Sequence, residues 1–512
     1  MRIGIDVGGT NTDAVLMNGT HVLASHKTPT TSDVTSGITD ALKTVMSQAA
    51  VPASDIQTVM IGTTHFTNAI VERRRLTEVA AIRLGLPATK ALPPMIDWPD
   101  DLRMAIGAHR YLAHGGYEFN GQKISDIDQE ELRNIGAEIH GKGIRSIAIS
   151  SVYSPVNTDI EEEAAKILQE TIPGVSVTLS HEIGRIGLLE RENAAILNAC
   201  LRELADQIVE AFGAALKDLQ IDAPFYLSQN DGTLMNDEFA RKYPVLTIAS
   251  GPTNSMRGAA FLSGVKDGVV VDVGGTTSDV GMLLQGFPRE ASVAVEVGGV
   301  RTNFRMPDVY SFGLGGGSLV ADNGTLLIGP QSVGYELTKK ALVFGGDTLT
   351  TTDIIVAAGQ ADVGDGSKVD SLDASLVERS LERIQEMTEI AVDRMKTSAD
   401  AVPVIVVGGG SILITREVSG ASEMIKPDHF AVANAVGAAI AQVGGETDTI
   451  FSLDNISRDD ALTQAKDEAV QKAVANGAAP ESVEIVDIEE IPLAYLPGSA
   501  TRMRVKAIGD LK

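Results

Sequence analysis

The sequence has a single cysteine among its 512 residues, and this scarcity excludes several kinds of protein. Cys200 alone cannot build a disulfide framework, nor a four-cysteine metal cluster within one chain. None of the eight histidines lies in an HExxH pattern or another tight metal-binding spacing, so a catalytic zinc site is not expected. We expect the reducing cytoplasm as the location, because the charged start MRIGID also lacks the apolar core of a signal peptide.

Long apolar runs and positive charge are scarce as well. The most apolar windows, such as VPVIVVGGGSILI, are broken by glycines and fall short of the roughly 18 apolar residues that a membrane span needs. The 42 basic and 68 acidic residues give a net charge of -26, which disfavours binding to nucleic acid and to anionic membrane surfaces. We therefore expect no nucleic-acid partner and no membrane segment.

Two common nucleotide-binding loops are also missing. The sequence contains neither GxxxxGKS nor GxxxxGKT. Its two Asp-Val-Gly-Gly-Thr stretches do not supply the GxGxxG turn that leads into a helix in dinucleotide-binding domains. A nucleotide, if one binds, must be held by another kind of loop.

One short stretch does occur twice. The chain begins MRIGIDVGGTNTDAVLM and later reads GVVVDVGGTTSDVGMLL, which matches Asp6 with Asp272 and Asp13 with Asp279. The glycines permit close approach of the backbone to a ligand, and backbone N–H groups and Thr hydroxyls in such a turn converge on anionic oxygens. Neighbouring carboxylates can hold Mg²⁺, which bridges to phosphates. A single copy is equally consistent with an ordinary β-hairpin, but two matching copies favour a nucleotide gripped from both sides.

Short β-rich runs alternate with helical patterns along the chain, which predicts an α/β fold. A chain of 512 residues exceeds what one core usually supports, so at least two domains are expected. A long helical stretch that begins near Leu188 marks the predicted passage into the second half. The predicted domains are residues 1–190, residues 191–445 and a small C-terminal α+β appendage over residues 446–512.

The repeated stretches resemble the actin-like ATPase superfamily, which includes sugar kinases and heat-shock chaperones. In that superfamily two related, ribonuclease H-like domains each contribute a phosphate-binding hairpin to a cleft, and a later Gly-Gly-Gly turn meets the adenosine. The segment VPVIVVGGGSIL fits this third element, with Gly408, Gly409 and Gly410 between a buried strand and a predicted helix. The resemblance implies two actin-like ATPase domains that face a nucleotide cleft, with ATP as the nucleotide.

Further stretches narrow the resemblance to the hydantoinase/oxoprolinase family, whose members open cyclic amides and imides at the expense of ATP. The stretches that carry it, in the family's order, are GIDVGGTNTD, IGTTHFTNAIVER, LLERENAAILNAC, QNDGTLM, SGPTNS, VGGTTSDVG, GLGGGSL and GPQSVG. Two segments depart from the family pattern, residues 192–195 and residues 335–344. Both are predicted to lie where a substrate could bind, so the identity of the amide stays open.

The family resemblance implies an ATP-dependent hydrolase of hydantoin or 5-oxoproline type. Transfer of the γ-phosphoryl group to the ring carbonyl oxygen, helped by Mg²⁺, would turn a poor leaving oxygen into phosphate. It also implies a second, hydantoinase B-like subunit and an oligomer. Two alternatives stay open: a carboxylase component that phosphorylates an enol oxygen, and a chaperone-like ATPase that remodels a partner enzyme.

The candidate site residues follow from the motifs. Asp6 and Asp272 are predicted to be metal-linked carboxylates, while Asp13 and Asp279 are predicted either to orient each turn or to act in catalysis. The predicted phosphate-binding residues are Gly8, Gly9, Thr10, Asn11 and Thr12 in the first turn, and Gly274, Gly275, Thr276 and Thr277 in the second. Further predicted cleft residues are Thr63 and Thr64, with Glu190, Arg191, Asn230 and Asp231 on the substrate side. Ser250, Gly251 and Pro252 are predicted to shape a loop at the cleft.

Overall fold

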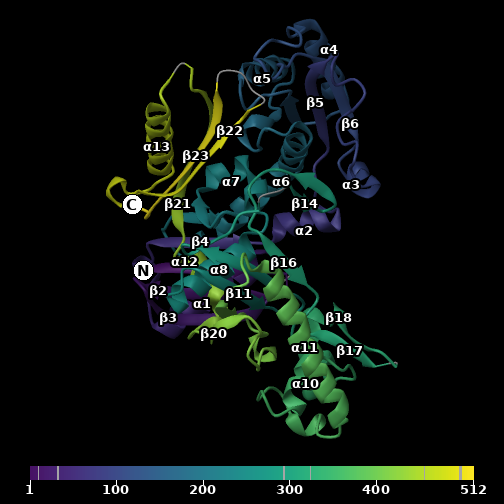
Figure 1. Cartoon of the computed structure of the whole chain (residues 1–512), viewed down its shortest axis with the longest axis vertical. Helices are drawn as coiled ribbons and strands as arrows, with labels where there is room; N and C mark the ends of the chain where they lie inside the picture. Colours follow the sequence, from purple (N-terminus) through teal and green to yellow (C-terminus); the bar gives the residue numbers. More distant parts are fainter. Residues whose placement is uncertain (10, 31–33, 292–293, 323, 455, 495–498) are drawn as a thin grey trace.

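A computed structural model describes the chain except for a few short gaps (Figure 1). The described residues are 1–9, 11–30, 34–291, 294–322, 324–454, 456–494 and 499–512. Within this part of the chain, no helix combines the length and the apolar character that crossing a bilayer requires.

The largest sheet has nine strands and begins at the N-terminus. Its order is β22-β23-β21-β10-β9-β4-β1-β2-β3. The bounds are β1 Arg2–Val7, β2 Asn11–Asn18, β3 His21–Pro29, β4 Thr58–Thr63, β9 Phe225–Ser228, β10 Thr233–Met235, β21 Gln442–Ser452, β22 Glu484–Pro492 and β23 Ala500–Gly509. Because side chains alternate along a strand, Ile3 and Ile5 of β1 pack into the core with helices α1 (Val34–Ala49) and α6 (Leu188–Asp218). On the opposite face, Val15 and Met17 of β2 pack against α12 (Ala433–Ala439).

A second sheet repeats the first one's start. Its order is β13-β12-β11-β19-β20, with β16 also paired to β12. The bounds are β11 Gly268–Val273, β12 Ser278–Leu284, β13 Phe287–Pro288, β16 Val309–Phe312, β19 Val402–Val407 and β20 Ala421–Ile425. One face packs against α10 (Thr351–Ala357) and α11 (Ala374–Met395), and the other against α8 (Ser250–Ser263).

The two sheets share one topology around the repeated stretch. In each, an antiparallel hairpin is followed by a strand that pairs in parallel with the hairpin's first strand, β4 with β1 and β19 with β11. The register is also the same, with Asp6 opposite Asp13 and Asp272 opposite Asp279. The sequence repeat is therefore a structural repeat.

A separate four-stranded parallel sheet is inserted into the first half (Figure 1). Its order is β6 (His109–His114), β5 (Val79–Leu86), β7 (Ser146–Ser151) and β8 (Ser176–Leu179), and it is packed against α4 (Gln129–Gly141) and α5 (Asp159–Thr171). The remaining elements are α2 His65–Glu72, α3 Asp100–Ala105, α7 Asp237–Lys242, β14 Val295–Val297, β15 Val300–Thr302, β17 Ser318–Asp322, β18 Leu326–Ser332, α9 Leu337–Lys340 and α13 Arg458–Ala475.

Sheet membership crosses the predicted domain limits. Strands β9 and β10, from the predicted second domain, lie in the N-terminal sheet, and β21 to β23 extend that same sheet. The limits at residues 190 and 445 thus separate strands that pair with one another in one sheet. The division of the chain into domains at these two limits stays a prediction. Sequence pattern alone could not reveal these pairings, because it reports which residues form strands and not which distant strands meet.

Two local predictions were wrong. Ser250, Gly251 and Pro252 form the first turn of α8 rather than a loop, since proline is tolerated where helical N–H groups have no partner. The glycine triplet at 408–410 leads into a three-residue 3-10 turn, Ser411–Leu413, and not into an α-helix.

Candidate nucleotide site

The first hairpin carries a pair of buried carboxylates at its mouth. Asp6 and Asp13 face each other across β1 and β2, and each is less than 5% exposed. Asn434 of α12 donates to both, with its Nδ2 3.0 Å from Asp6 Oδ2 and 2.8 Å from Asp13 Oδ2. Lys27 of β3 pairs with Asp13 at 2.6 Å, and Asn254 of α8 donates to Asp6 at 3.4 Å. One carboxylate of this pair therefore has a cation beside it, and the other has only amide donors.

The second hairpin repeats this arrangement with different partners. Ser255 of α8 donates a hydrogen bond to Asp272, and Ser311 of β16 donates one to Asp279. Gly408, which follows β19, lies directly against Asp272, where a β-carbon would overlap the carboxylate oxygen. Its φ of +86° is a conformation that favours glycine. The third glycine-rich segment is thus fitted against the second hairpin.

Helix α8 joins the two hairpins. Its consecutive residues Asn254 and Ser255 bond Asp6 of the first sheet and Asp272 of the second. A β-carbon at Gly409 would lie 3.5 Å from Lys27 Cε. The glycine triplet that follows β19 of the second sheet therefore lies next to Lys27 of the first sheet. The structure therefore gathers the repeated carboxylates of both sheets around one region.

The electrostatics of this region favour a bound cation. Burial, the negative charge of Asp13 and more weakly that of Asp272 raise the pKa of Asp6 to about 6, against the hydrogen bonds of Asn254 and Asn434. Burial, with a contribution from Asp272, raises the pKa of Asp279 to about 6, and burial also raises the pKa of Asp272. These carboxyl groups are held in surroundings that penalise their negative charge, and a cation among them would relieve that penalty.

A magnesium ion fits this donor set in the way that nucleotide sites use it. Among the described residues, no three metal-binding side chains lie close enough to hold an ion by themselves. Mg²⁺ usually keeps several waters and is bound through one or two carboxylates together with substrate phosphates. Asp6 and Asp272 could supply those carboxylates from the two sheets.

The turns that close the hairpins have matching geometry. Gly8 N donates to Asn11 O at 3.0 Å, and Gly274 N donates to Thr277 O at 2.9 Å. Thr12 is buried with its hydroxyl 3.3 Å from that of Thr30, so it braces the first turn from inside. Gly9 is exposed, and nothing lies within 4 Å of the place where its β-carbon would be. Thr10, also predicted to bind phosphate, lies outside the described residues.

The second turn rests on the GLGGGSL segment. Gly316 N donates to Gly274 O at 3.1 Å, and Gly317 N donates to Gly275 O at 2.8 Å. Thr276 is partly exposed and Thr277 is exposed. The carbonyl groups of Gly274 and Gly275 are therefore already hydrogen-bonded within the protein, while Thr276 and Thr277 are accessible to solvent.

Comparison with known proteins assigns the chain. Residues 2–172 match the hydantoinase/oxoprolinase N-terminal region, and residues 191–399 match hydantoinase/oxoprolinase. The chain belongs to the hydantoinase/oxoprolinase family. The resemblance inferred from the motifs is confirmed.

Relatives in this family carry different activities in their names. The chain is 27% identical to the caprolactamase subunit alpha of Pseudomonas jessenii over 390 residues, which cover 70% of this chain and 54% of that protein. It is also 27% identical to the acetophenone carboxylase gamma subunit of Aromatoleum aromaticum over 396 residues, which cover 70% of this chain and 53% of that one. The chain thus spans about half the length of these two relatives.

The fold is shared with a solved structure. The ATP-dependent caprolactamase from Pseudomonas jessenii superposes with a TM-score of 0.80 at 19% sequence identity, covering 100% of this chain and 88% of that chain. The expected α/β fold of the actin-like ATPase type is confirmed.

Two threonines of the family's Gly-Thr-Thr motif form part of the wall beside the first hairpin. Thr63 ends β4 and is buried, with its hydroxyl 2.5 Å from His65 Nδ1. The Thr64 hydroxyl donates to Val7 O at 3.1 Å, and the start of α8 at Gly251 lies beside it. Burial, and then the positive charge of Arg75, lower the pKa of His65 to about 4, so this imidazole is neutral at physiological pH. Sequence reasoning missed His65.

The predicted substrate residues lie on two elements, the first turn of α6 and the β9–β10 turn, and the segment from Arg301 to Arg305 contacts both. Glu190 lies in the first turn of α6 and pairs with Arg301 at 3.4 Å. Arg191 is fully buried, and its guanidinium donates to the Ser180 hydroxyl and to three backbone carbonyls, those of Ser151, Arg185 and Ile186. These bonds give Arg191 a structural role in joining α6 to the inserted sheet, and its role beside a substrate stays a prediction.

Asn230 and Asp231 lie instead in the turn between β9 and β10. Asn230 O accepts a hydrogen bond from the Thr253 hydroxyl of α8 at 2.8 Å, which places this turn next to the helix that carries Asn254. Asp231 forms an ion pair with Lys506 of β23 at 2.9 Å. This turn is thus held between α8 and the C-terminal strands.

Several residues of the site were not predicted. Asn254 and Ser255 belong to the SGPTNS motif, so that motif could have identified them if it had been interpreted as a helix. Asn434 and Lys27 had no such signal, because nothing in the sequence shows that α12 or β3 reaches the first hairpin.

Proposed function

We propose that this chain is the ATP-binding component of an ATP-dependent hydrolase of cyclic amides or imides, of hydantoin or 5-oxoproline type. The observation that carries the proposal is the matched register of the two hairpins, with Asp6 and Asp272 held by consecutive residues of α8. The name of the caprolactamase relative supports an amide substrate.

In the proposed reaction, the γ-phosphoryl group of ATP is transferred to the ring carbonyl oxygen, which releases ADP. Water then adds to the carbonyl carbon and the ring opens at its carbon–nitrogen bond, with a proton passing to the nitrogen, which leaves an acyl phosphate. A second water hydrolyses the acyl phosphate to a carboxylate and inorganic phosphate. Mg²⁺ held by Asp6 and Asp272 would neutralise the phosphate charges. The turn backbones at Gly8, Gly9, Gly274 and Gly275, with Asn11, Thr12, Thr276 and Thr277, would hold the phosphates. Gly408 to Gly410 would lie on the adenosine side.

The proposed roles of the other polar residues follow from their contacts. Asp13, which is held by Lys27 and Asn434, would keep the first turn in place and orient Asp6 through Asn434. Asp279, which is held by Ser311, would do the same for the second turn. Thr63 and Thr64 would line the first sheet's side of the cleft.

A partner subunit is part of the proposal. The two relatives are named as subunits, alpha of a caprolactamase and gamma of a carboxylase, and this chain spans about half of each. We propose a hydantoinase B-like subunit that completes the hydrolysis, in a hetero-oligomer.

A second candidate activity is phosphorylation of an enol oxygen in a carboxylase, which the acetophenone carboxylase relative supports. Phosphate release from ATP separates the two. With its B-like subunit present, we expect the chain to release phosphate faster when hydantoin or 5-oxoproline is added. Stimulation only by a ketone with bicarbonate would replace the amidase by the carboxylase. Stimulation by the partner protein alone would instead indicate a remodelling ATPase.

A further inference from the structure

Three consecutive residues of α8 contact three different parts of the molecule. The Thr253 hydroxyl donates to Asn230 O in the β9–β10 turn, Asn254 donates to Asp6, and Ser255 donates to Asp272. All three side chains are at most 3% exposed. Successive residues point in different directions around a helix, so this one turn of α8 touches the first sheet, the second sheet and the β9–β10 turn at once.

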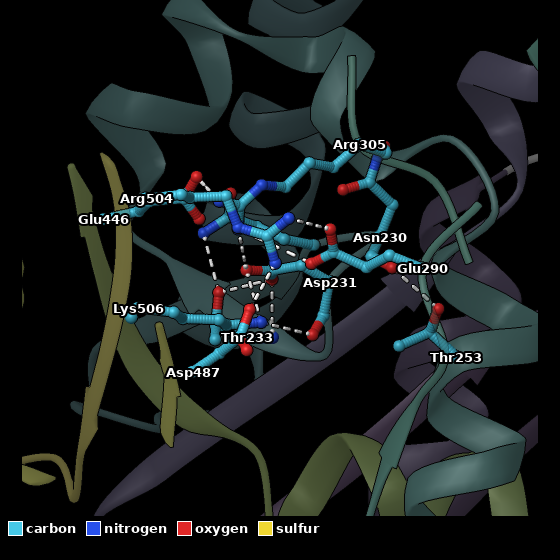
Figure 2. A network of polar contacts seen from close by, with 12 residues as sticks. Asn230, Asp231, Thr233, Thr253, Glu290, Arg305, Glu446, Asp487, Arg504 and Lys506 are labelled. Carbon is cyan, nitrogen blue, oxygen red and sulfur yellow. Dashed lines mark hydrogen bonds and ion pairs between the residues drawn. The ribbon is translucent and has the colours of Figure 1, made fainter. Parts of the chain in front are cut away.

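Strand β23 also contacts the β9–β10 turn. Lys506 of β23 is 5% exposed, and its Nζ lies 2.9 Å from Asp231 Oδ2 and 3.0 Å from Asp231 O (Figure 2). The other oxygen of Asp231 accepts from the backbone N–H and the hydroxyl of Thr233, at 3.0 and 2.6 Å. Burial acts to raise the pKa of Asp231, but Lys506 and Arg305 outweigh it and hold that pKa well below its usual range. Asp231 is therefore a charged, fully bonded anchor.

Charges from several segments surround this anchor (Figure 2). Asn230 Nδ2 donates to Arg305 O at 2.6 Å, which ties the turn to the segment after β15. The Arg305 guanidinium contacts Glu446 of β21 and lies 3.7 Å from Glu290. Arg504 of β23 bridges Glu290 to Asp487 of β22. Strands β21, β22 and β23 are thus connected to the β9–β10 turn through a continuous network of polar side chains.

We propose that Lys506, Asp231, Asn230 and Thr253 form a positioning chain through which strand β23 sets the place of α8 at the nucleotide site. This inference rests on the proposed function. The Asn254–Asp6 hydrogen bond, at 3.4 Å, is already near the limit of useful length. A small displacement of α8 would therefore break it, and the same displacement would move Ser255 relative to Asp272.

A purely stabilising role is the alternative: the ion pair would only dock the C-terminal strands, and the Thr253 hydroxyl would only cap a local contact. The two accounts differ in additivity. Links of one chain give non-additive effects on turnover, because breaking the second link adds little once the first is broken. Independent stabilising contacts give effects that multiply.

The test is a double-mutant cycle with Thr253→Val and Lys506→Met, measured as kcat and KM for ATP in the complete enzyme. We expect Thr253→Val to lower kcat roughly three- to tenfold, the change that corresponds to one lost hydrogen bond. Lys506→Met should lower it at least as much, and the double variant should be no slower than Lys506→Met alone. Arg458→Met is the matched control, since Arg458 pairs with Glu490 on the exposed side of the same C-terminal strands and should leave kcat unchanged. Multiplying effects in the double variant would overturn the proposal.

A second measurement keeps the inference separate from the proposed function. Lys506→Met leaves Asp231 buried without its lysine, so Asp231→Asn/Lys506→Met is prepared as well, and folding is checked by circular dichroism. Amide hydrogen exchange of the nucleotide-free protein should rise in residues 250–258 in Thr253→Val and in the Lys506 variants, and not in Arg458→Met. Unchanged exchange in 250–258 would overturn the positioning chain even if ATP is hydrolysed. Raised exchange in a chain that does not bind ATP would instead refute only the proposed function.

Discussion

Replacing Asp272 by Asn is expected to lower the rate of ATP hydrolysis by roughly 100- to 1000-fold, the range seen when a preorganised group at a developing charge is removed. The substitution removes one negative charge and keeps the shape of the side chain. Ser255 retains an acceptor, because the amide oxygen can take the place of the carboxylate oxygen. Since burial already disfavours the charged form of Asp272 and raises its pKa, the neutral side chain should not destabilise the fold.

The matched control lies at the other end of the same strand. Asp267 immediately precedes β11, is exposed, and accepts a hydrogen bond from Gln285 N at 3.0 Å. Asp267→Asn should leave ATP hydrolysis within about twofold of the unmodified protein, as surface substitutions away from a site usually do. An Asp272→Asn protein that turns ATP over at the unmodified rate would remove the second hairpin from the reaction.

The second large effect concerns stability rather than turnover. Glu192→Gln is expected to reduce the free energy of unfolding by about 3–5 kcal/mol, the cost of leaving one partner of a buried ion pair uncompensated. Glu192 Oε2 accepts from Arg83 Nε at 2.7 Å and from the Ser150 hydroxyl at 2.6 Å, and both charged side chains are at most 3% exposed. Because Arg83 lies on β5 and Glu192 on α6, the ion pair links the inserted four-stranded sheet to helix α6.

Urea unfolding curves measure this loss. Glu138→Gln serves as the control, since Glu138 pairs with Lys142 one helical turn away at 2.6 Å on the surface, and its loss should change the unfolding midpoint little. A Glu192→Gln protein as stable as the unmodified one would contradict the structural role of this pair.

The sequence was enough to predict the two matching hairpins. Two copies of one stretch, each a strand with Asp before Gly-Gly-Thr, predicted a pair of hairpins, and the structure gives Asp6–Asp13 and Asp272–Asp279 the same cross-strand register. Local pattern carries this information, because hairpin register depends on residues that are neighbours in the sequence.

The supporting residues could not be predicted in the same way. Asn434 reaches Asp6 only because α12 packs against β1, a contact between residues more than 400 positions apart. Likewise, the pairing of β21 with β10 places the C-terminal strands in the N-terminal sheet, and a sequence pattern does not say which distant strands pair. The motif of Arg191 likewise did not indicate that its side chain is buried and donates to backbone carbonyl groups.

The most direct test is a crystal structure of the enzyme with a non-hydrolysable ATP analogue and Mg²⁺. The proposed function requires the β- and γ-phosphates to lie between the turn that follows β1 and the turn that follows β11, with the metal beside Asp6 and Asp272. An analogue held by only one of these turns, or bound elsewhere on the molecule, would contradict it.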